Sequence, residues 1–380
     1  MMTAIMRFFP VDNGDMTLLQ LESGRFLLVD INIRSDADDP DGEKPDVAAQ
    51  LRKLLPRDSQ DRLYVDAFLL SHPDQDHCRG LGSHFHLGPA DEWSKKDDKI
   101  LIREMWSSPI VFRRASRNHT LCEDARLWNS EARRRVKRFR DGGAGKDGER
   151  ILILGEDENG KTDDLTDILV KVDETFSFMN GSLDDSFSAT LLAPLPINDD
   201  EEELSKNKSS VILQFSIAGG GVPGKCLYLT GGDAEVAIWE RLWQQHKKDP
   251  DVLSYDVLLT PHHCSWRSLS YDSWSDKGED AQVCQDAQSA LSQAKPGAIL
   301  IASSKPVLND SNDPPCFRAK REYENIADEC DGSFECVGDL SPKALEIEIG
   351  SNGPKPRAKL LTSAAIVSSG LVGSQPVGHG

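Results

Sequence analysis

The sequence lacks several patterns that would place it in a familiar class of protein. Its eight cysteines are scattered between Cys78 and Cys336 and form no C-x-x-C pair. It has no run of eighteen apolar residues, and its start has no basic segment followed by an apolar one. These absences argue against a zinc knuckle, a transmembrane helix and a secretory signal. We therefore expect a cytoplasmic protein with reduced thiols and no membrane contact.

Positive charge is also scarce. The chain carries 44 Lys and Arg against 63 Asp and Glu, a formal net charge of −19. This balance disfavours a protein that coats nucleic acid without sequence preference, because binding to phosphates needs local positive charge. The exception is the strongly basic stretch 111–140.

The basic stretch has two interpretations. It could bind phosphates of a substrate, with Trp106 and Trp128 stacking on bases. The candidate substrate-binding residues are Arg113, Arg114, Arg117 and His119. Alternatively, it is a solvated helix whose arginines pair with acidic groups of the body or of a partner protein.

The remaining pattern predicts an α/β protein. Residues 17–32 read as two strands around a Ser-Gly turn, 46–55 as a helix and 63–71 as a buried strand. Later segments alternate between strands and helices in the same way. A hairpin is expected at 209–233, and a strand precedes each of the motifs TGGD (230–233) and PHHCS (261–265). Helices are expected at 165–176, 234–246 and 317–328. We expect one domain over residues 1–350, a largely helical insertion at about 88–150, and a flexible tail at 351–380.

Polar clusters follow three of the predicted strands. They are "SHPDQDH" (71–77), "TGGD" (230–233) and "PHHCS" (261–265). Such clusters can converge on one edge of a sheet. Histidine and aspartate side chains bind divalent ions, and two neighbouring ions can activate a water molecule and hold a phosphoryl or acyl oxygen. Three clusters in this order favour a two-metal site over a set of capped turns.

These motifs resemble the metallo-β-lactamase fold, and specifically its competence-protein (ComEC-like) nuclease-domain branch. The similar patterns are H-x-D-x-D-H at 72–77, GD at 232–233 and HH-x-S at 262–265, together with the opening segment 11–30. The resemblance covers roughly residues 6–85 and 185–330. It implies an αββα sandwich with metal ions at the sheet edges, here carrying the basic, largely helical insertion.

The resemblance also implies roles for individual residues. One ion would be held by His72 and Asp74. The other would be held by Asp76 and His77, with His262 or His263 opposite, and Asp233 would bridge both ions. Asp76, His262 and His263 are the candidate catalytic residues, and which of the two histidines is the ligand stays open. Asp30 would orient a ligand without touching an ion.

The sequence departs from the family pattern at three places, one of which is the usual late HPH segment, replaced here by SNDPPCF (311–317). There is no histidine from residue 120 to 245, where most of the superfamily has a further ligand. In the ComEC-like pattern this position falls near Asn207 and Ser210. Cys264 replaces the usual glycine of HHGS, either as a packing residue or as an additional soft ligand.

These features predict a metal-dependent hydrolase, foremost a phosphodiesterase or nuclease that uses a water activated by two divalent ions. We expect Mn²⁺ or Zn²⁺, with Mg²⁺ as an alternative, because carboxylate-rich sites suit harder ions. The expected substrate is a nucleic acid or nucleotide. The alternatives are a hydrolase of a small phosphoester or other ester, and a partner-gated or degenerate regulatory module. The oligomeric state stays open.

Overall fold

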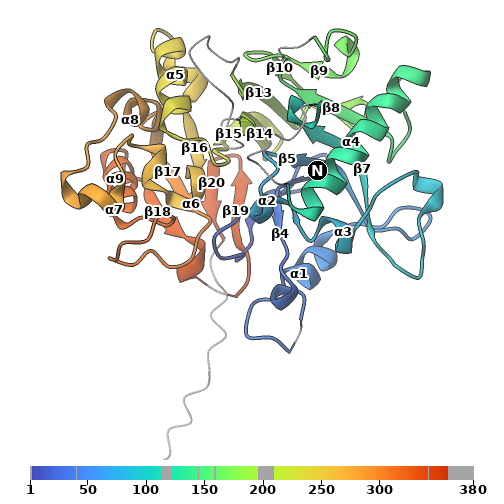
Figure 1. Cartoon of the computed structure of the whole chain (residues 1–380), viewed down its shortest axis with the longest axis horizontal. Coiled ribbons are helices and arrows are strands. Elements are labelled where there is room, and N and C mark those ends of the chain that lie inside the picture. Colours follow the sequence, from blue (N-terminus) through green and yellow to red (C-terminus); the bar gives the residue numbers. More distant parts are fainter. Residues whose placement is uncertain are drawn as a thin grey trace, which may run out of the picture.

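Two large β-sheets pack face to face, and helices cover their outer faces (Figure 1). The computed structural model describes residues 2–39, 41–112, 121–143, 145–157, 160–195, 209–340 and 342–357. The mixed α/β class predicted from the sequence is confirmed. Among the described residues, no helix combines the length and the apolar character needed to cross a membrane.

The first sheet has ten strands. Its spatial order is β20 (Gly353–Pro356), β19 (Leu345–Gly350), β1 (Ala4–Phe8), β2 (Thr17–Gln20), β3 (Phe26–Val29), β5 (Tyr64–Leu70), β7 (Ile100–Ser107), β8 (Arg150–Leu154) and β9 (Leu169–Val170). The short β6 (Phe85–His86) also pairs with β7, while β4 (Ile31–Asn32) continues the chain after β3. Pairing is antiparallel from β20 to β3 and parallel from β3 onward.

The second sheet has seven strands. Its order is β10 (Thr175–Phe176), β13 (Phe187–Ala193), β14 (Ile212–Gly219), β15 (Val222–Leu229), β16 (Tyr255–Leu259), β17 (Ala294–Ala302) and β18 (Ser333–Cys336). The strands from β15 to β18 are parallel, and the others are antiparallel. A separate hairpin pairs β11 (Phe178–Met179) with β12 (Ser182–Leu183). The predicted hairpin at 209–233 is confirmed as β14 and β15.

Helices lie on both sides of the sheet pair. The longer ones are α1 (Val47–Leu54), α4 (Glu123–Gly142), α5 (Val236–His246), α8 (Gln285–Leu291) and α9 (Phe317–Glu329). Single-turn helices are α2 (Gln75–Cys78), α3 (Leu81–His84), α6 (Pro261–Cys264) and α7 (Trp274–Lys277). In Figure 1, α1, α3 and α4 lie on one side and α5, α8 and α9 on the other.

Three apolar clusters hold these layers together. The cluster between the sheets contains residues of both, such as Ala67 of β5 and Tyr228 of β15. A second cluster joins the first sheet to α1 and α4, and a third joins the second sheet to α5, α8 and α9. In β5, Ala67 faces the other sheet, whereas Phe68 faces the helices. Burial on both faces explains why β5 is a continuous apolar run and not an alternating one.

The predicted insertion at 88–150 is corrected by the structure. Its residues 100–107 form β7, which lies between β5 and β8 within the first sheet. The sequence pattern conceals this strand because "ILIREMWS" carries an arginine and a glutamate, although Glu104 is buried. The stretch is therefore part of the sheet and its covering layer, and only α4 is a helix of more than one turn among its described residues.

The expected role of two tryptophans is also wrong. Trp106 is 0% exposed and Trp128 is 1% exposed, so neither presents a face to a base. The basic residues of α4 from 133 to 140 contact carboxylates or backbone carbonyls within the chain. For this part of the basic stretch, the structure agrees with the second interpretation, a helix whose arginines pair with acidic groups of the body. Arg113, Arg114, Arg117 and His119 lie outside the described residues.

Two further segments differ from expectation. Residues 165–176 form a 3₁₀ turn and strands β9 and β10, not a helix, because the chain crosses here from the first sheet to the second. Asp173 has a left-handed backbone (φ 68°), which interrupts helical geometry. The expected tail begins later than residue 351, since 353–356 forms β20 and pairs with β19. Residues 358–380 lie outside the described part of the chain.

Candidate metal centre

Four segments that are distant in the sequence meet at one edge of the sheet pair. The first motif follows β5 and enters α2, and the loop between β1 and β2 lies against it, with the Asp15 amide donating to the Asp76 carbonyl at 3.2 Å. From the second sheet come the loop after β15, with Asp233, and α6 after β16. Both α2 and α6 lie near the middle of Figure 1, where the two halves meet.

The histidine pair of α6 has an unusual backbone. His262 (φ 52°, ψ 47°), His263 (φ 54°, ψ 39°) and Cys264 (φ 66°) are all left-handed. This conformation costs a residue with a Cβ roughly 1–2 kcal/mol. Such strain is characteristic of functional sites, where the surrounding structure holds it in place. A glycine would adopt the φ of Cys264 without this cost.

The left-handed turn directs the two histidines to different partners. His262 Nε2 lies 3.7 Å from Asp233 Oδ2. His72 Nε2 lies 3.4 Å from the same oxygen and 3.7 Å from Asp74 Oδ2. We call these four side chains half-site one. Two ligand atoms bound to one zinc-sized ion lie about 3.3–3.6 Å apart, so the separation of 3.4 Å lies within that range and the two of 3.7 Å lie slightly above it.

Half-site two forms around the other oxygen of Asp233. His77 Nε2 lies 3.0 Å and His263 Nε2 3.4 Å from Asp233 Oδ1. His263 Nε2 also lies 3.5 Å from Asp76 Oδ2. Half-site two therefore consists of Asp76, His77, His263 and Asp233. The sequence leaves open which of His262 and His263 faces the motif, and the structure brings both into the cluster, one on each side.

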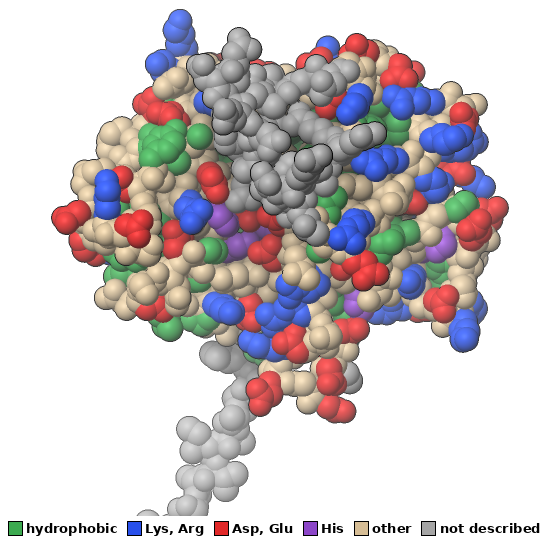
Figure 2. All heavy atoms as spheres, in the orientation of Figure 1, with side chains coloured by type: hydrophobic (Ala, Val, Ile, Leu, Met, Phe, Trp, Pro, Cys, Tyr) green, Lys and Arg blue, Asp and Glu red, His purple; other side chains and the backbone are tan. Residues whose placement is uncertain are grey.

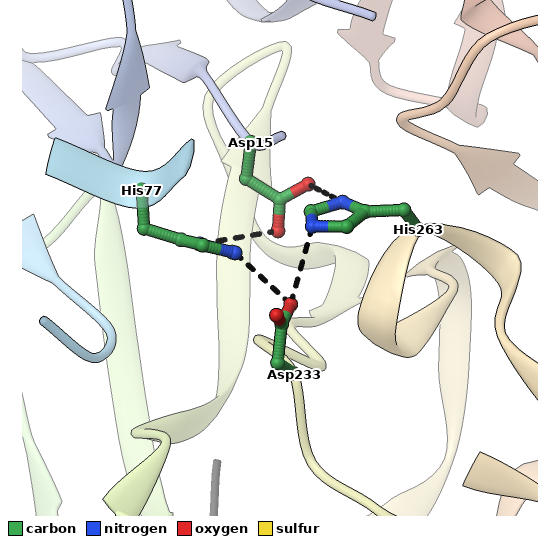
Figure 3. A group of neighbouring side chains, drawn as sticks. All are labelled: Asp15, His77, Asp233 and His263. Atoms are coloured by element: carbon green, nitrogen blue, oxygen red, sulfur yellow. Dashed lines mark ion pairs between the residues drawn. The ribbon is translucent and has the colours of Figure 1, made fainter. Parts of the chain in front are cut away.

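Asp15 completes a buried group with His77, Asp233 and His263 that could hold a metal ion (Figure 3). Its Oδ1 lies 3.4 Å from His263 Nδ1, and its Oδ2 lies 3.8 Å from His77 Nδ1. Asp15 thus faces the Nδ1 atoms of both rings, whereas Asp233 faces their Nε2 atoms. Because Asp30 already contacts His77 Nδ1 at 2.8 Å, we regard Nε2 as the ligand atom and Asp15 as an orienting group.

Buried polar atoms without a partner converge at this place. Asp233 Oδ1 and the Nε2 atoms of His72, His77 and His263 are buried and have no hydrogen-bond partner among the described residues. An unsatisfied buried polar atom costs about 1–3 kcal/mol, so several together need an explanation. Ligation of a cation by these atoms provides one.

The electrostatics of the cluster favour bound positive charge. Burial acts to raise the pKa of Asp233, but His77, His263 and His72 lower it well below its usual value. Burial acts to lower the pKa of His263, yet Asp233, Asp15 and Asp76 raise it to about 10. The carboxylates therefore attract protons to the rings, and a metal ion that binds must displace them.

Asp30 supports both histidines of the first motif. Its carboxylate contacts His77 Nδ1 and accepts hydrogen bonds from the Ser71 amide at 2.7 Å and the Ser71 hydroxyl at 2.5 Å. The Ser71 hydroxyl lies 3.1 Å from His72 Nδ1. Asp30 therefore holds His77 directly and His72 through Ser71, leaving their Nε2 atoms directed at Asp233.

The other expected supporting residues have mixed outcomes. Ser210 accepts a hydrogen bond from the backbone amide of Asp233 at 3.2 Å, so it fixes the loop that carries this aspartate. Asn207 lies outside the described residues. The side chain of Cys264 belongs to the apolar cluster under α5, α8 and α9, which agrees with the packing interpretation of this residue.

We predict that Asp30→Asn weakens metal binding by about 10–100-fold. The Ser71 amide and His77 Nδ1 face different oxygens of Asp30, and an asparagine has only one carbonyl oxygen, so it cannot accept from both and His77 or its loop loses its fixed orientation. Asparagine tolerates the left-handed backbone of Asp30 (φ 52°), which keeps strain out of the comparison. Affinity for Zn²⁺ and Mn²⁺ is measured by competition with a chromogenic chelator. Asp66→Asn, at a buried aspartate bonded to Phe26 and Arg103, is the control and should leave affinity unchanged.

Sequence patterns alone assign no role to two residues of the cluster, Asp15 and Ser71. Asp15 lies within the opening segment 11–30, and Ser71 directly precedes His72. For Asp15, the only signal in the sequence is an aspartate in a glycine-containing loop between two strands. That pattern is too common in proteins to mark a functional site. No protein-family model matches this sequence, and a search of curated proteins finds no significant match. The family resemblance therefore remains an interpretation of the motifs.

Proposed function

We propose that this protein is a metal-dependent phosphodiesterase of the metallo-β-lactamase fold, similar to its ComEC-like branch. Three features support the proposal. Two facing sheets have outer helices, ligand-type side chains follow β5, β15 and β16, and these side chains meet at one edge of the sheet pair. The αββα sandwich that the resemblance implies has this layout.

The observation that carries the proposal is the placement of Asp233. Each of its two oxygens faces a different pair of histidines: Oδ2 faces His72 and His262, and Oδ1 faces His77 and His263. A carboxylate that lies between two pairs of imidazoles could bridge two ions, each held by one pair. Asp74 and Asp76 add one carboxylate to each half-site.

Divalent ions at these half-sites would lower the pKa of a water molecule and stabilise negative charge on phosphoryl oxygens. The chain's own residues would prepare the site for this chemistry. Asp30 and Asp15 orient the imidazoles from the Nδ1 side, and Asp233 fixes the spacing of the two half-sites. The mixed imidazole and carboxylate donors suit Mn²⁺ or Zn²⁺, with Mg²⁺ as the harder alternative.

The test is hydrolysis of bis(p-nitrophenyl) phosphate and of single- and double-stranded DNA and RNA, each with Mn²⁺, Zn²⁺ or Mg²⁺. Asp74→Ala and Asp76→Ala remove one carboxylate from each half-site. We expect the wild type to cleave with at least one metal, and each variant to bind one ion fewer by elemental analysis and to lose about 100-fold or more in kcat/KM. Bound metal without turnover of any phosphodiester would overturn the proposal.

A further inference from the structure

A polar pocket opens directly beside half-site two. Its volume is about 310 Å³, and Asp76 belongs both to its wall and to the half-site. The other residues that line it are Asp12, Asn13, Asn32, Arg34, Gln75, Arg79 and Lys305. The loop that carries Asp12 and Asn13 continues to Asp15, so one loop forms part of both the pocket and the candidate metal centre.

The pocket carries more positive charge than its own acids neutralise. Arg34 lies 2.7 Å from Asp12, which also pairs with Lys44 at 3.0 Å. The side chains of Arg79 and Lys305 have no ion-pair or hydrogen-bond partner among the residues that the structure describes, and Arg79 Nε is buried. In a chain of net charge −19, two cations without an ion-pair partner beside the candidate metal centre suit an anionic ligand, although Lys305 is exposed and only Arg79 is partly buried.

Asn32 adds an acceptor to the same wall. It is 2% exposed, and its Nδ2 donates to the Val11 and Asn13 carbonyls, which fixes the orientation of the amide. Its Oδ1 is buried without a hydrogen-bond partner within the described ranges. The pocket therefore offers cations for an anion and one acceptor for a hydroxyl or amino group beside it.

We propose that this pocket binds a phosphate group adjacent to the scissile one. The inference rests on the proposed phosphodiesterase function and specifies its substrate class. Such a substrate carries at least two successive phosphates, as a nucleotide chain or a nucleoside polyphosphate does and an isolated phosphodiester does not. Arg79 and Lys305 contact the second phosphate, and Asn32 accepts from a neighbouring sugar or base.

The surface agrees with this placement. In Figure 2, histidine and acidic side chains appear together near the middle of the face, and Lys and Arg side chains gather below them. Because Asp76 both lines the pocket and lies 3.5 Å from His263, the pocket is next to half-site two. Arg79 follows Asp76 by three residues at the end of α2, so the same helical turn supplies a metal ligand and a phosphate contact.

The first test measures binding without turnover. Inorganic pyrophosphate is titrated by calorimetry into wild type, Arg79→Gln, Lys305→Gln and the double variant, all in EDTA. We expect about tenfold weaker binding of pyrophosphate for each single variant, because each one loses a charge-assisted contact to the anion. Lys248→Gln, at an exposed lysine beyond α5 and outside the pocket, should bind as wild type does. Equal affinity of the double variant and wild type would overturn the proposal.

The second test compares substrates in the presence of the activating metal. Bis(p-nitrophenyl) phosphate has one phosphate, the trinucleotide d(TpTpT) has two in a chain, and ATP has a polyphosphate. The double variant should raise KM for the trinucleotide, for ATP or for both. The substrate that is affected identifies the source of the second phosphate. KM for the simple diester should stay within about twofold of the wild-type value. An equal loss on all three would contradict a phosphate subsite. Pyrophosphate binding that depends on Arg79 and Lys305, without hydrolysis of any substrate, would support the pocket while refuting the phosphodiesterase.

Discussion

Asp233→Asn is expected to lower kcat/KM for any phosphodiester by at least about a thousandfold, which is about 4 kcal/mol of transition-state stabilisation. The side chain serves both half-sites, with Nε2 atoms of His77 and His262 at 3.0 and 3.7 Å from its two oxygens. A neutral amide supplies only one oxygen and no charge. Elemental analysis of the purified variant should therefore show loss of both ions, not one.

The matched control for this variant is Asp328→Asn, an exposed aspartate on α9 and remote from the candidate metal centre. It removes the same charge from a chain of the same composition and should leave activity and metal content unchanged. If Asp233→Asn kept its metal content and stayed within threefold of the wild-type rate, Asp233 would not bridge two ions. The two half-sites would then have to be assigned separately, and the group with Asp15 would become the leading site.

The second large effect is expected far from the site, at Glu131 of α4. Its carboxylate is almost fully buried and accepts from Arg134 Nη2 at 2.7 Å, Arg135 Nε at 2.8 Å and the Gly88 amide at 3.0 Å. Arg135 is fully buried and donates further to the Ile102 and Arg150 carbonyls. Glu131→Ala should destabilise the fold by about 3–5 kcal/mol, because it leaves the Arg135 guanidinium buried without its counterion.

The same carboxylate makes stability depend on pH in an identifiable range. Burial acts to raise the pKa of Glu131, but Arg134 and Arg135 lower it from 4.5 to about 2. This difference corresponds to about 3 kcal/mol that is present above pH 4.5 and is lost as pH falls toward 2. The free energy of unfolding is measured in urea for Glu131→Gln and wild type. The difference between the two proteins should therefore be large at pH 7 and smaller at pH 3.

A matched exposed pair serves as the control for Glu131. Asp141 pairs with Lys137 on the same helix, but both side chains are more than half exposed. Asp141→Asn should cost less than about 1 kcal/mol, since water and salt screen such pairs. A gap between Glu131→Gln and wild type that is equally wide at both pH values would contradict the assigned ionisation.

Sequence patterns predict those parts of the site that depend on strand ends. His72, Asp74, Asp76 and His77 follow an apolar run, and a run of that kind is recognisable as a buried strand from its composition and length. Asp233 is predictable for the same reason, because it follows β15. These residues meet because β5 of the first sheet and β15 of the second sheet end at the same edge of the sheet pair.

Other parts of the site depend on conformations that local patterns do not reveal. Consecutive histidines in a strand would point to opposite faces, whereas the left-handed turn of α6 directs both His262 and His263 toward Asp233. Asp15 acquires its place through long-range hydrogen bonds of its loop, such as those from the Asp15 amide to the Asp76 carbonyl and from the Ser303 hydroxyl to the Gly14 carbonyl.

Strand β7 is a further case, because a buried glutamate and nearby arginines make its sequence look solvent-exposed. Its burial depends on hydrogen bonds from distant parts of the chain. The Asn180 amide donates to the Glu104 carboxylate at 2.7 Å, and the Arg135 guanidinium donates to the Ile102 carbonyl at 3.0 Å. A local sequence window contains neither donor, so it cannot show that the strand is internal.

The distance in sequence between Asp15 and His263 has a consequence for biosynthesis. Half-site one lacks a residue until His262 has left the ribosome and half-site two until His263 has, because each takes one histidine from α6 and shares Asp233 from the loop after β15. The first sheet can begin to fold from its amino-terminal strands long before that point. A nascent chain therefore carries His72, Asp74, Asp76 and His77 long before their partners from the second sheet exist, and the cluster can form only after the two sheets have met.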